Sequence, residues 1–254
     1  MTSRIAVVND KYQKMKEARY FYVPDAANCA ELPVDEAVHA LRVLRLQSGD
    51  EIFLMDGEGS FYRAQVTLAS SKHCSYQVLE RMAPPKDWRG RIHLAVAPTK
   101  MMERMEWMAE KATEIGFDQL SLLCCKFSER KVVNVQRLDK IIISAVKQSR
   151  KPYKPVLSPL VPFDQFVSTP REGLKFIAHC YDEIPRQDLF STLQAQTGDM
   201  ECTILVGPEG DFSIDEVHLA MTHGYVPVSL GNFRLRTETA GLMAVAMAQL
   251  VLRR

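Results

Sequence analysis

Two loops near the carboxyl end of the chain are the most informative segments of the sequence: LVGPEGDFSIDE, Leu205–Glu216, and SLGNFRLRTETA, Ser229–Ala240. Each loop follows a short apolar run typical of a strand and leads into a helical pattern. In the first, Ser213 and Glu216 form a capping box that opens a helix, and Gly224 ends it. Ligands bind at this edge of open α/β sheets, so both loops are candidate binding loops.

The first loop contains the tetrapeptide GPEG, Gly207–Gly210. Its two glycines let the backbone approach a ligand closely, Pro208 stiffens the turn, and Glu209 places a carboxylate at the sheet edge. A tight strand-to-helix turn with a solvated glutamate explains the same residues. Both interpretations stay open from these residues alone.

The second loop carries two arginines, Arg234 and Arg236, directly before a helix. The amino end of a helix favours anions, so these cations are not there to stabilise the helix. Thr237 is a plausible N-cap and Glu238 complements the helix dipole, which gives both of them a structural explanation. The arginines are therefore the stronger candidates for a functional role.

From Arg91 onward the chain alternates strand-like apolar runs with amphipathic helical runs, which predicts a mainly parallel sheet covered by helices. The expected strands are Ile92–Ala97, Leu120–Cys124, Lys175–His179, Thr203–Val206 and Val226–Ser229. The expected helices are Met101–Ile115, Arg137–Ser149, Ser213–Gly224 and Glu238–Leu252. Apolar residues surround the last helix almost completely, so the sheet and a partner subunit should both cover it, which predicts a homodimer.

The amino-terminal third has a different pattern. Residues 19–82 are expected to form a small, mostly β domain, after an extension over residues 1–18 and before a linker over residues 83–90, with residues 91–254 as the larger domain. The expected strands of the small domain are Tyr20–Val23, Glu51–Met55, Phe61–Val66 and Tyr76–Leu79, with one helix over Ala37–Leu44.

Composition excludes several classes of protein. Thirty-two Lys and Arg against 31 Asp and Glu leave a net charge of +1, so a polyanion would have to be held by a local patch. The absence of an apolar run of ~18 residues and of a signal peptide predicts a cytoplasmic protein. The six cysteines show no CxxC spacing, which indicates free thiols and no metal.

The two loops together resemble the signature of the RsmE family, SPOUT-type methyltransferases that modify N3 of a uridine in 16S ribosomal RNA of the small subunit. The resemblance continues, in the same order, in TKMMERMEWMAEKATEIG (99–116), SER (128–130), AVKQSRK (145–151), RYFYV (19–23) and HALRVLRLQSGDEIFLMDGEG (39–59). It implies a trefoil-knotted α/β domain with a mainly parallel sheet, and a small PUA-like RNA-binding β-barrel.

The resemblance also implies that S-adenosylmethionine binds in the knot, largely through backbone groups, with Arg236 and Glu209 as catalytic candidates. Arg236 would stabilise the developing uracil anion, while Glu209 would act as a base or anchor an arginine. The implied cofactor contacts are His179, Leu205, Val206, Gly207, Pro208, Glu209, Gly210, Leu230, Gly231, Asn232, Phe233, Arg234, Leu235, Arg236 and Thr237.

Two positions depart from the family pattern. Asn232 and Phe233 precede Arg234, so the loop arginine is shifted by one residue, and Asp211 stands where the family commonly has a glycine. The shift means that Arg234 does not occupy the position of the family's loop arginine. The aspartate adds a negative charge near the expected pocket.

The target uridine has to be unpaired or flipped out of its stack, because N3 lies on the Watson–Crick edge. Phosphates would be bound by basic residues, for which the candidates are Arg19, Lys126, Arg130, Lys131, Lys147, Arg150 and Lys151. Solvated charge on loops and helix ends is the alternative for these clusters.

Three other functions compete with this prediction: an RNA-binding module without catalysis, a SPOUT enzyme that methylates another base or a ribose, and a nucleotide-hydrolysing enzyme. The last is disfavoured because no GxxxxGK[ST] loop exists. A chain starting at Met15 is expected to keep its melting temperature and its activity, because Thr2–Lys14 offer little apolar surface for packing. The alternative is a real extension whose helix packs on the small domain.

Overall fold

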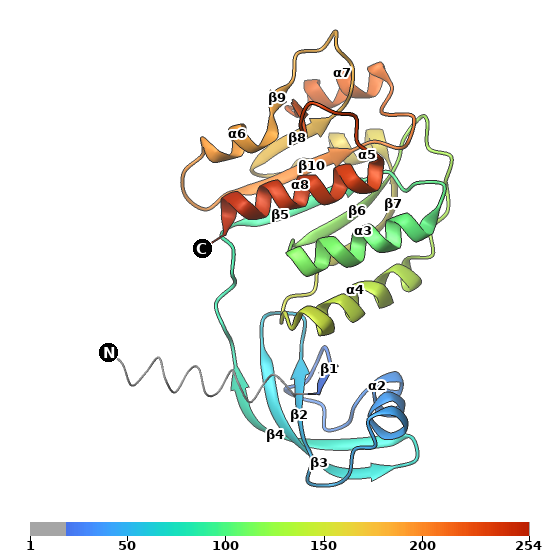
Figure 1. Cartoon of the computed structure of the whole chain (residues 1–254), viewed down its shortest axis with the longest axis vertical. Coiled ribbons are helices and arrows are strands. Elements are labelled where there is room, and N and C mark those ends of the chain that lie inside the picture. Colours follow the sequence, from blue (N-terminus) through green and yellow to red (C-terminus); the bar gives the residue numbers. More distant parts are fainter. Residues whose placement is uncertain (1–18, 254) are drawn as a thin grey trace. The chain divides into compact units, whose positions relative to one another are not determined.

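The computed structural model describes residues 19–253, and the predicted extension over residues 1–18 lies outside this range. The chain divides into two compact units (Figure 1). The smaller comprises the chain up to Pro85 together with Ser149–Tyr153, and the larger begins at Lys86 and holds the remainder. The short segment Ser149–Tyr153 thus packs with the smaller unit, although its sequence neighbours belong to the larger one.

The smaller unit is built on a four-stranded sheet in the order β1-β2-β3-β4. Its strands are β1 (Tyr20–Tyr22), β2 (Glu51–Met55), β3 (Phe61–Ser70) and β4 (His73–Met82). Strand β1 pairs in parallel with β2, and the other pairs are antiparallel. Strands β3 and β4 are longer than predicted, because they continue to pair with each other up to Ser70 and His73, where the residues of β3 are mostly exposed and give no apolar signal in the sequence.

The predicted helix over Ala37–Leu44 is two elements. Helix α2 (Val34–Val38) continues as a π-helical turn η2 (His39–Val43), in which Leu44 donates its backbone N–H to the His39 carbonyl at 3.1 Å. Ala37 in α2 and Ala40 in η2 are both fully buried, in the same core cluster as Phe21.

The larger unit contains a seven-stranded, entirely parallel sheet in the order β7-β6-β5-β10-β8-β11-β9. Its strands are β5 (Arg91–Val96), β6 (Gln119–Cys124), β7 (Val156–Pro162), β8 (Leu174–Ala178), β9 (Gln187–Asp188), β10 (Glu201–Val206) and β11 (Val226–Ser229). Its helices are α3 (Met102–Ile115), α4 (Val135–Ser149), α5 (Phe163–Ser168), α6 (Leu189–Gln194), α7 (Ile214–Thr222) and α8 (Thr237–Leu252). The prediction of an α/β domain with a mainly parallel sheet is confirmed.

The order of the strands brings segments that are distant in sequence together at one edge. The chain leaves β8, forms the outer strand β9, and then returns to the middle of the sheet as β10, between β5 and β8. Strand β11 then pairs on the other side of β8, and α8 runs back over β5 and β10, beside α3 and α6 (Figure 1). The loops that follow β8, β10 and β11 therefore meet around the start of α8.

Helix α8 is largely buried within the chain itself. Gly241 lets it approach α3 and β5 closely, since an added Cβ would lie 2.6 Å from the Met108 sulfur and 3.4 Å from Leu94. Met243 and Leu250 stay 38% and 59% exposed, seven residues apart and hence on the same face. This exposed face is the part of α8 that the predicted partner subunit would cover. No helix within residues 19–253 is long and apolar enough to cross a membrane.

Candidate functional site

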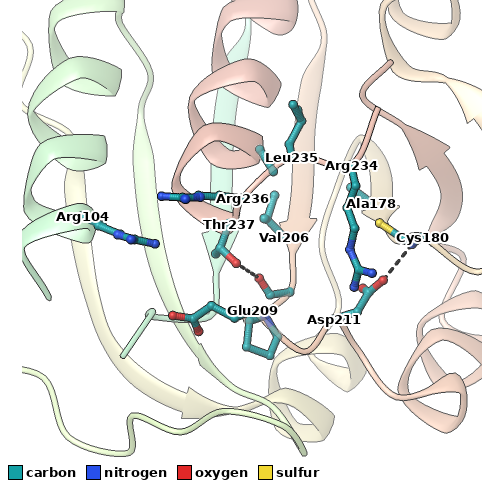
Figure 2. Close-up of a pocket in the computed structure, with 13 residues that line it drawn as sticks. Arg104, Ala178, Cys180, Val206, Glu209, Asp211, Arg234, Leu235, Arg236 and Thr237 are labelled. Carbon is teal, nitrogen blue, oxygen red and sulfur yellow. Dashed lines mark hydrogen bonds between the residues drawn. The ribbon is translucent and has the colours of Figure 1, made fainter. Parts of the chain in front are cut away.

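A cavity of about 430 Å³ opens at the carboxyl ends of β8 and β10, beside the start of α8. Figure 2 shows the side chains around it. They come from α3, from the last residues of β8 and β10, from the three loops that follow β8, β10 and β11, and from the first turn of α8: Arg104, Ala178, Cys180, Val206, Gly207, Pro208, Glu209, Asp211, Arg234, Leu235, Arg236, Thr237 and Ala240. This is the edge of the sheet at which the sequence predicts a binding site.

Many of the residues implied as cofactor contacts lie around this cavity, but not all. Those that line it are Val206, Gly207, Pro208, Glu209, Arg234, Leu235, Arg236 and Thr237. A second cavity of about 510 Å³ is lined by Gly231, Asn232, Phe233 and Arg234. The two cavities share Cys180 and Arg234.

Four of the predicted contacts line neither cavity: Leu205, Gly210, Leu230 and His179. Leu205 is fully buried in the sheet core, and Gly210 lies against Phe127. The His179 ring is buried beside Tyr181, whose backbone N–H donates to Nδ1 at 3.2 Å. Burial lowers the pKa of His179, so this ring is neutral at pH 7.

Two hydrogen bonds fasten the three loops to one another (Figure 2). The Thr237 hydroxyl donates to the Gly207 carbonyl at 3.0 Å, and the Cys180 backbone N–H donates to the Asp211 carboxylate at 2.8 Å. Helix α8 begins at Thr237 with Arg236 as its N-cap, so the prediction that Thr237 is the N-cap is wrong. Its hydroxyl is instead used to join two loops.

The conformation and contacts of Asp211 explain why an aspartate can stand where the family commonly has a glycine. Its φ is +66°, a left-handed conformation that glycine adopts without strain and that aspartate tolerates better than most residues. Its carboxylate then binds the loop after β8, which a glycine could not do. Cys180 is exposed as a whole, but partial loss of hydration at its thiol, together with this neighbouring carboxylate, raises the thiol's pKa, so the thiol is protonated at pH 7.

We expect Thr237→Val to destabilise the protein by about 1 to 3 kcal/mol, because the buried Gly207 carbonyl loses its donor while the side-chain volume stays similar. Equilibrium denaturation in urea measures this change. Thr222→Val is the matched control, since its hydroxyl donates to Leu219 at an exposed site on α7. If the two variants are equally stable, the hydrogen bond between Thr237 and Gly207 does not stabilise the protein.

Glu209 fixes the entrance of the cavity. Its Oε1 accepts the Lys100 backbone N–H at 2.9 Å, and Arg130 donates to the Thr99 carbonyl at 3.1 Å and to that of Lys100. The other Glu209 oxygen has no partner within residues 19–253. Glu209 thus anchors the turn before α3 and still presents a free carboxylate oxygen.

Sequence reasoning missed five residues of the cavity, of which Arg104 is the only one with a positive charge; the others are Ala178, Cys180, Asp211 and Ala240. Arg104 lies on α3, and its guanidinium approaches the carboxylate of Glu238 at 3.5 Å. Arg104 stands in the first turn of its helix, where a cation is unfavourable. The argument that singled out Arg234 and Arg236 therefore applied equally to Arg104.

The predicted RNA-binding residues do not form one cluster. Arg130 is engaged with backbone carbonyls, Lys126 forms an exposed ion pair with Asp215 at 3.3 Å, and Lys131 is exposed. Arg19 pairs with Asp50 at 3.3 Å. The other candidates divide between the units: Lys147 belongs to the larger, while Arg150 and Lys151 belong to the smaller, where Arg150 lies over the Tyr20 ring at 5.4 Å.

Comparison with known proteins identifies both units. Residues 86–249 match the family model of an RNA methyltransferase domain, and residues 32–79 match that of an RNA methyltransferase PUA domain. Ribosomal RNA small subunit methyltransferase E of Mycobacterium bovis is 30% identical over 242 residues, which cover 90% of each chain.

Two solved structures share the fold along nearly the whole chain. A probable rRNA-methyltransferase from Porphyromonas gingivalis is 42% identical, covers 92% of this chain and 98% of its own, and superposes with a TM-score of 0.85. Ribosomal RNA small subunit methyltransferase E from Neisseria gonorrhoeae, bound to S-adenosyl methionine, is 27% identical, with coverage of 93% and 98% and a TM-score of 0.76. The predicted SPOUT fold and PUA-like domain are confirmed.

Proposed function

We propose that this chain, which belongs to the ribosomal RNA small subunit methyltransferase E family, transfers a methyl group from S-adenosylmethionine to N3 of a uridine in 16S ribosomal RNA. One observation carries the proposal. The loops Leu205–Glu216 and Ser229–Ala240, which resemble the family signature, meet around a single cavity at the carboxyl edge of the sheet. An RNA-binding module without catalysis would not need this cavity.

The residues of the cavity fit the cofactor. Small and apolar side chains suit an adenine ring, and the cavity offers Ala178, Val206, Pro208, Leu235 and Ala240 for this purpose. Backbone groups of the same loops would supply hydrogen bonds to the polar parts of the cofactor. The carboxylates of Glu209 and Asp211 favour the positive charge of a sulfonium centre. When bound, S-adenosylmethionine supplies a methyl group on that charged sulfur.

The chain's own residues have to prepare the base for the transfer. N3 of uridine is a weak acid, and it becomes a nucleophile only when it loses its proton. Glu209 is placed to accept that proton through its free oxygen, at the mouth of the cavity. Arg236 is placed to stabilise the resulting anion, because its side chain has no hydrogen bond or ion pair within residues 19–253.

The RNA has to reach this cavity from the surface. Exposed Lys131 and the weakly paired Lys126 can contact phosphates near the larger unit, and Arg19, Arg150 and Lys151 can do so on the smaller unit. We assign the PUA-like domain to residues 19–82 and the methyltransferase domain to residues 91–254. An enzyme that acts on the small ribosomal subunit works in the cytoplasm.

The proposal is tested by mass spectrometry of ribosomal nucleosides from a strain that lacks the gene. We expect 3-methyluridine to be missing from 16S RNA and to return when the gene is supplied on a plasmid. Loss of a ribose methyl or of another methylated base, with 3-methyluridine unchanged, would contradict the proposed substrate. Unchanged nucleosides of every kind would contradict the enzymatic activity.

The active protein is proposed to be a homodimer that buries the remaining apolar face of α8. Met243 and Leu250 form this face, and both stay exposed in the part of the chain that the structure describes. We expect light scattering to give twice the chain mass of 28.8 kDa at micromolar concentration. A mass of one chain would contradict the dimer.

Leu250→Glu is expected to convert the dimer into monomers, because a carboxylate in an apolar interface loses its hydration without gaining a partner. Val132→Glu is the control, since Val132 is even more exposed, at 79%, but lies outside α8. Sedimentation velocity distinguishes the two variants. A dimer that persists in Leu250→Glu would place the interface elsewhere.

A further inference from the structure

We infer that Arg104 is a second catalytic cation for the reacting base, and that the buried Glu238 positions it. The inference rests on the proposed function. Arg104 lies on α3, Arg236 lies before α8, and both line the same cavity. In Figure 2 the two side chains extend toward each other, and Glu209 lies below them in this view.

The contact between Arg104 and Glu238 leaves the guanidinium free to donate. Its closest approach to the carboxylate, 3.5 Å, is longer than a well-formed N–H···O hydrogen bond. The arginine side chain is 35% exposed, so it faces the cavity with several unused N–H groups. An arginine serving only to neutralise the glutamate would be expected to close a shorter, bidentate pair.

Glu238 is built as a support for this arginine. Its side chain is only 9% exposed, and its Oε2 has no hydrogen-bond partner within residues 19–253. A buried carboxylate with one unpaired oxygen lowers the stability of the protein, so its presence indicates a role other than stabilisation. Arg104 is the cation beside this carboxylate. The carboxylate attracts the guanidinium, but at 3.5 Å it leaves the N–H groups of the arginine available to another acceptor.

Two cations match the charge that develops on the base. N3 of uracil lies between two carbonyl groups, so the negative charge left by proton loss spreads onto O2 and O4. N3 gives its proton to a base, its electron pair forms the new bond to the methyl carbon, and the electron pair of the broken carbon–sulfur bond stays on sulfur. One guanidinium at each carbonyl oxygen stabilises the anion more than a single one.

The test compares Arg104→Ala with the wild type on 16S RNA. We expect kcat to fall roughly a hundredfold, as for the loss of one preorganised donor, while S-adenosylhomocysteine binds with unchanged affinity in calorimetry. The ascending limb of the kcat–pH profile should move to higher pH, because the pKa of N3 in the bound base is higher without the positive charge of Arg104. Lys111→Ala is the matched control on α3, since Lys111 pairs with Glu110 and Glu114 outside the cavity.

A substrate of altered acidity separates a chemical role from a structural one. RNA containing 5-fluorouridine has a more acidic N3, so it depends less on stabilisation of the anion. We expect the loss of kcat in Arg104→Ala to be clearly smaller on this RNA than on ordinary RNA. An equal loss on both substrates would overturn the inference, because a merely misfolded site is insensitive to the acidity of the base.

Glu238→Gln tests the positioning role. The amide keeps the shape of the side chain but loses its charge, so we expect a smaller fall in kcat than in Arg104→Ala and a smaller shift of the pH profile in the same direction. The double variant with Arg104→Ala should be no worse than Arg104→Ala alone, because Glu238 acts through that arginine. Additive losses would overturn this part of the inference.

The outcomes also distinguish the inference from the proposed function. A wild-type protein that forms 3-methyluridine, with an unaffected Arg104→Ala variant, contradicts only the role of Arg104. A wild-type protein that forms no 3-methyluridine contradicts the proposed function, and the inference fails with it.

Discussion

Replacing Arg236 by alanine is expected to lower kcat about 10²- to 10³-fold, equivalent to roughly 2.7 to 4 kcal/mol of activation free energy. The side chain lines the cavity and has no partner within residues 19–253, so its charge is available to the developing anion. Affinity for S-adenosylhomocysteine should stay close to the wild-type value, because the proposed cofactor contacts are largely to backbone. Single-turnover kinetics and calorimetry measure the two quantities separately.

Arg137→Ala is the matched control for this variant. Arg137 is an exposed arginine on α4 that pairs with Glu106 at 2.6 Å, and it does not line the cavity. Its loss should change neither turnover nor cofactor affinity. If Arg236→Ala loses cofactor affinity together with activity, Arg236 binds the cofactor or supports the loop and does not stabilise the transition state.

Gly207→Ala is expected to weaken S-adenosylhomocysteine binding by about 1 to 3 kcal/mol, the usual cost of overpacking a tight site. An added Cβ would lie 2.9 Å from the Phe212 backbone nitrogen and 3.1 Å from the Asp211 carbonyl carbon. Backbone cannot yield as a flexible side chain does, so the loop after β10 has to shift. Gly207 lines the cavity, and the shift therefore reaches the ligand. Calorimetric titration measures the loss.

Gly210→Ala offers a control three residues along the same loop. There the three atoms nearest to the added Cβ all belong to the Phe127 side chain, the closest at 3.2 Å. Phe127 is 46% exposed and can move aside, so binding should change little. Equal affinities of the two variants would show that the close packing around Gly207 does not shape the binding site.

The sequence predicted the central strands well, and it missed elements for identifiable reasons. Strand β11 has the predicted bounds, and the capping box of Ser213 and Glu216 is present at the start of α7. Strand β7 was missed because Pro159 and Pro162 argue against a strand, although prolines are tolerated at the edge of a sheet. Strand β9 is two residues long, too short for any periodic signal.

Two of the three loops of the site could be predicted from their own residues. The third could not, because only the order of the strands brings it to the cavity. The loops after β10 and β11 were recognisable from their own residues, but the loop after β8 carries only HCYDE, His179–Glu183, which is poorly diagnostic. The structure shows that Cys180, and not His179, lines the cavity there. Side chains alternate along an extended segment, so neighbouring residues point in opposite directions.

The most direct measurement for the central claim is methyl transfer by the purified protein. Small ribosomal subunits and free 16S RNA from a strain that lacks the gene are incubated with the enzyme and S-adenosylmethionine carrying an isotopically labelled methyl group, and the nucleosides are identified by mass spectrometry. The account predicts labelled 3-methyluridine at a single position in at least one of these substrates. Label recovered in a ribose methyl or in another base, or no label in either substrate, would contradict it.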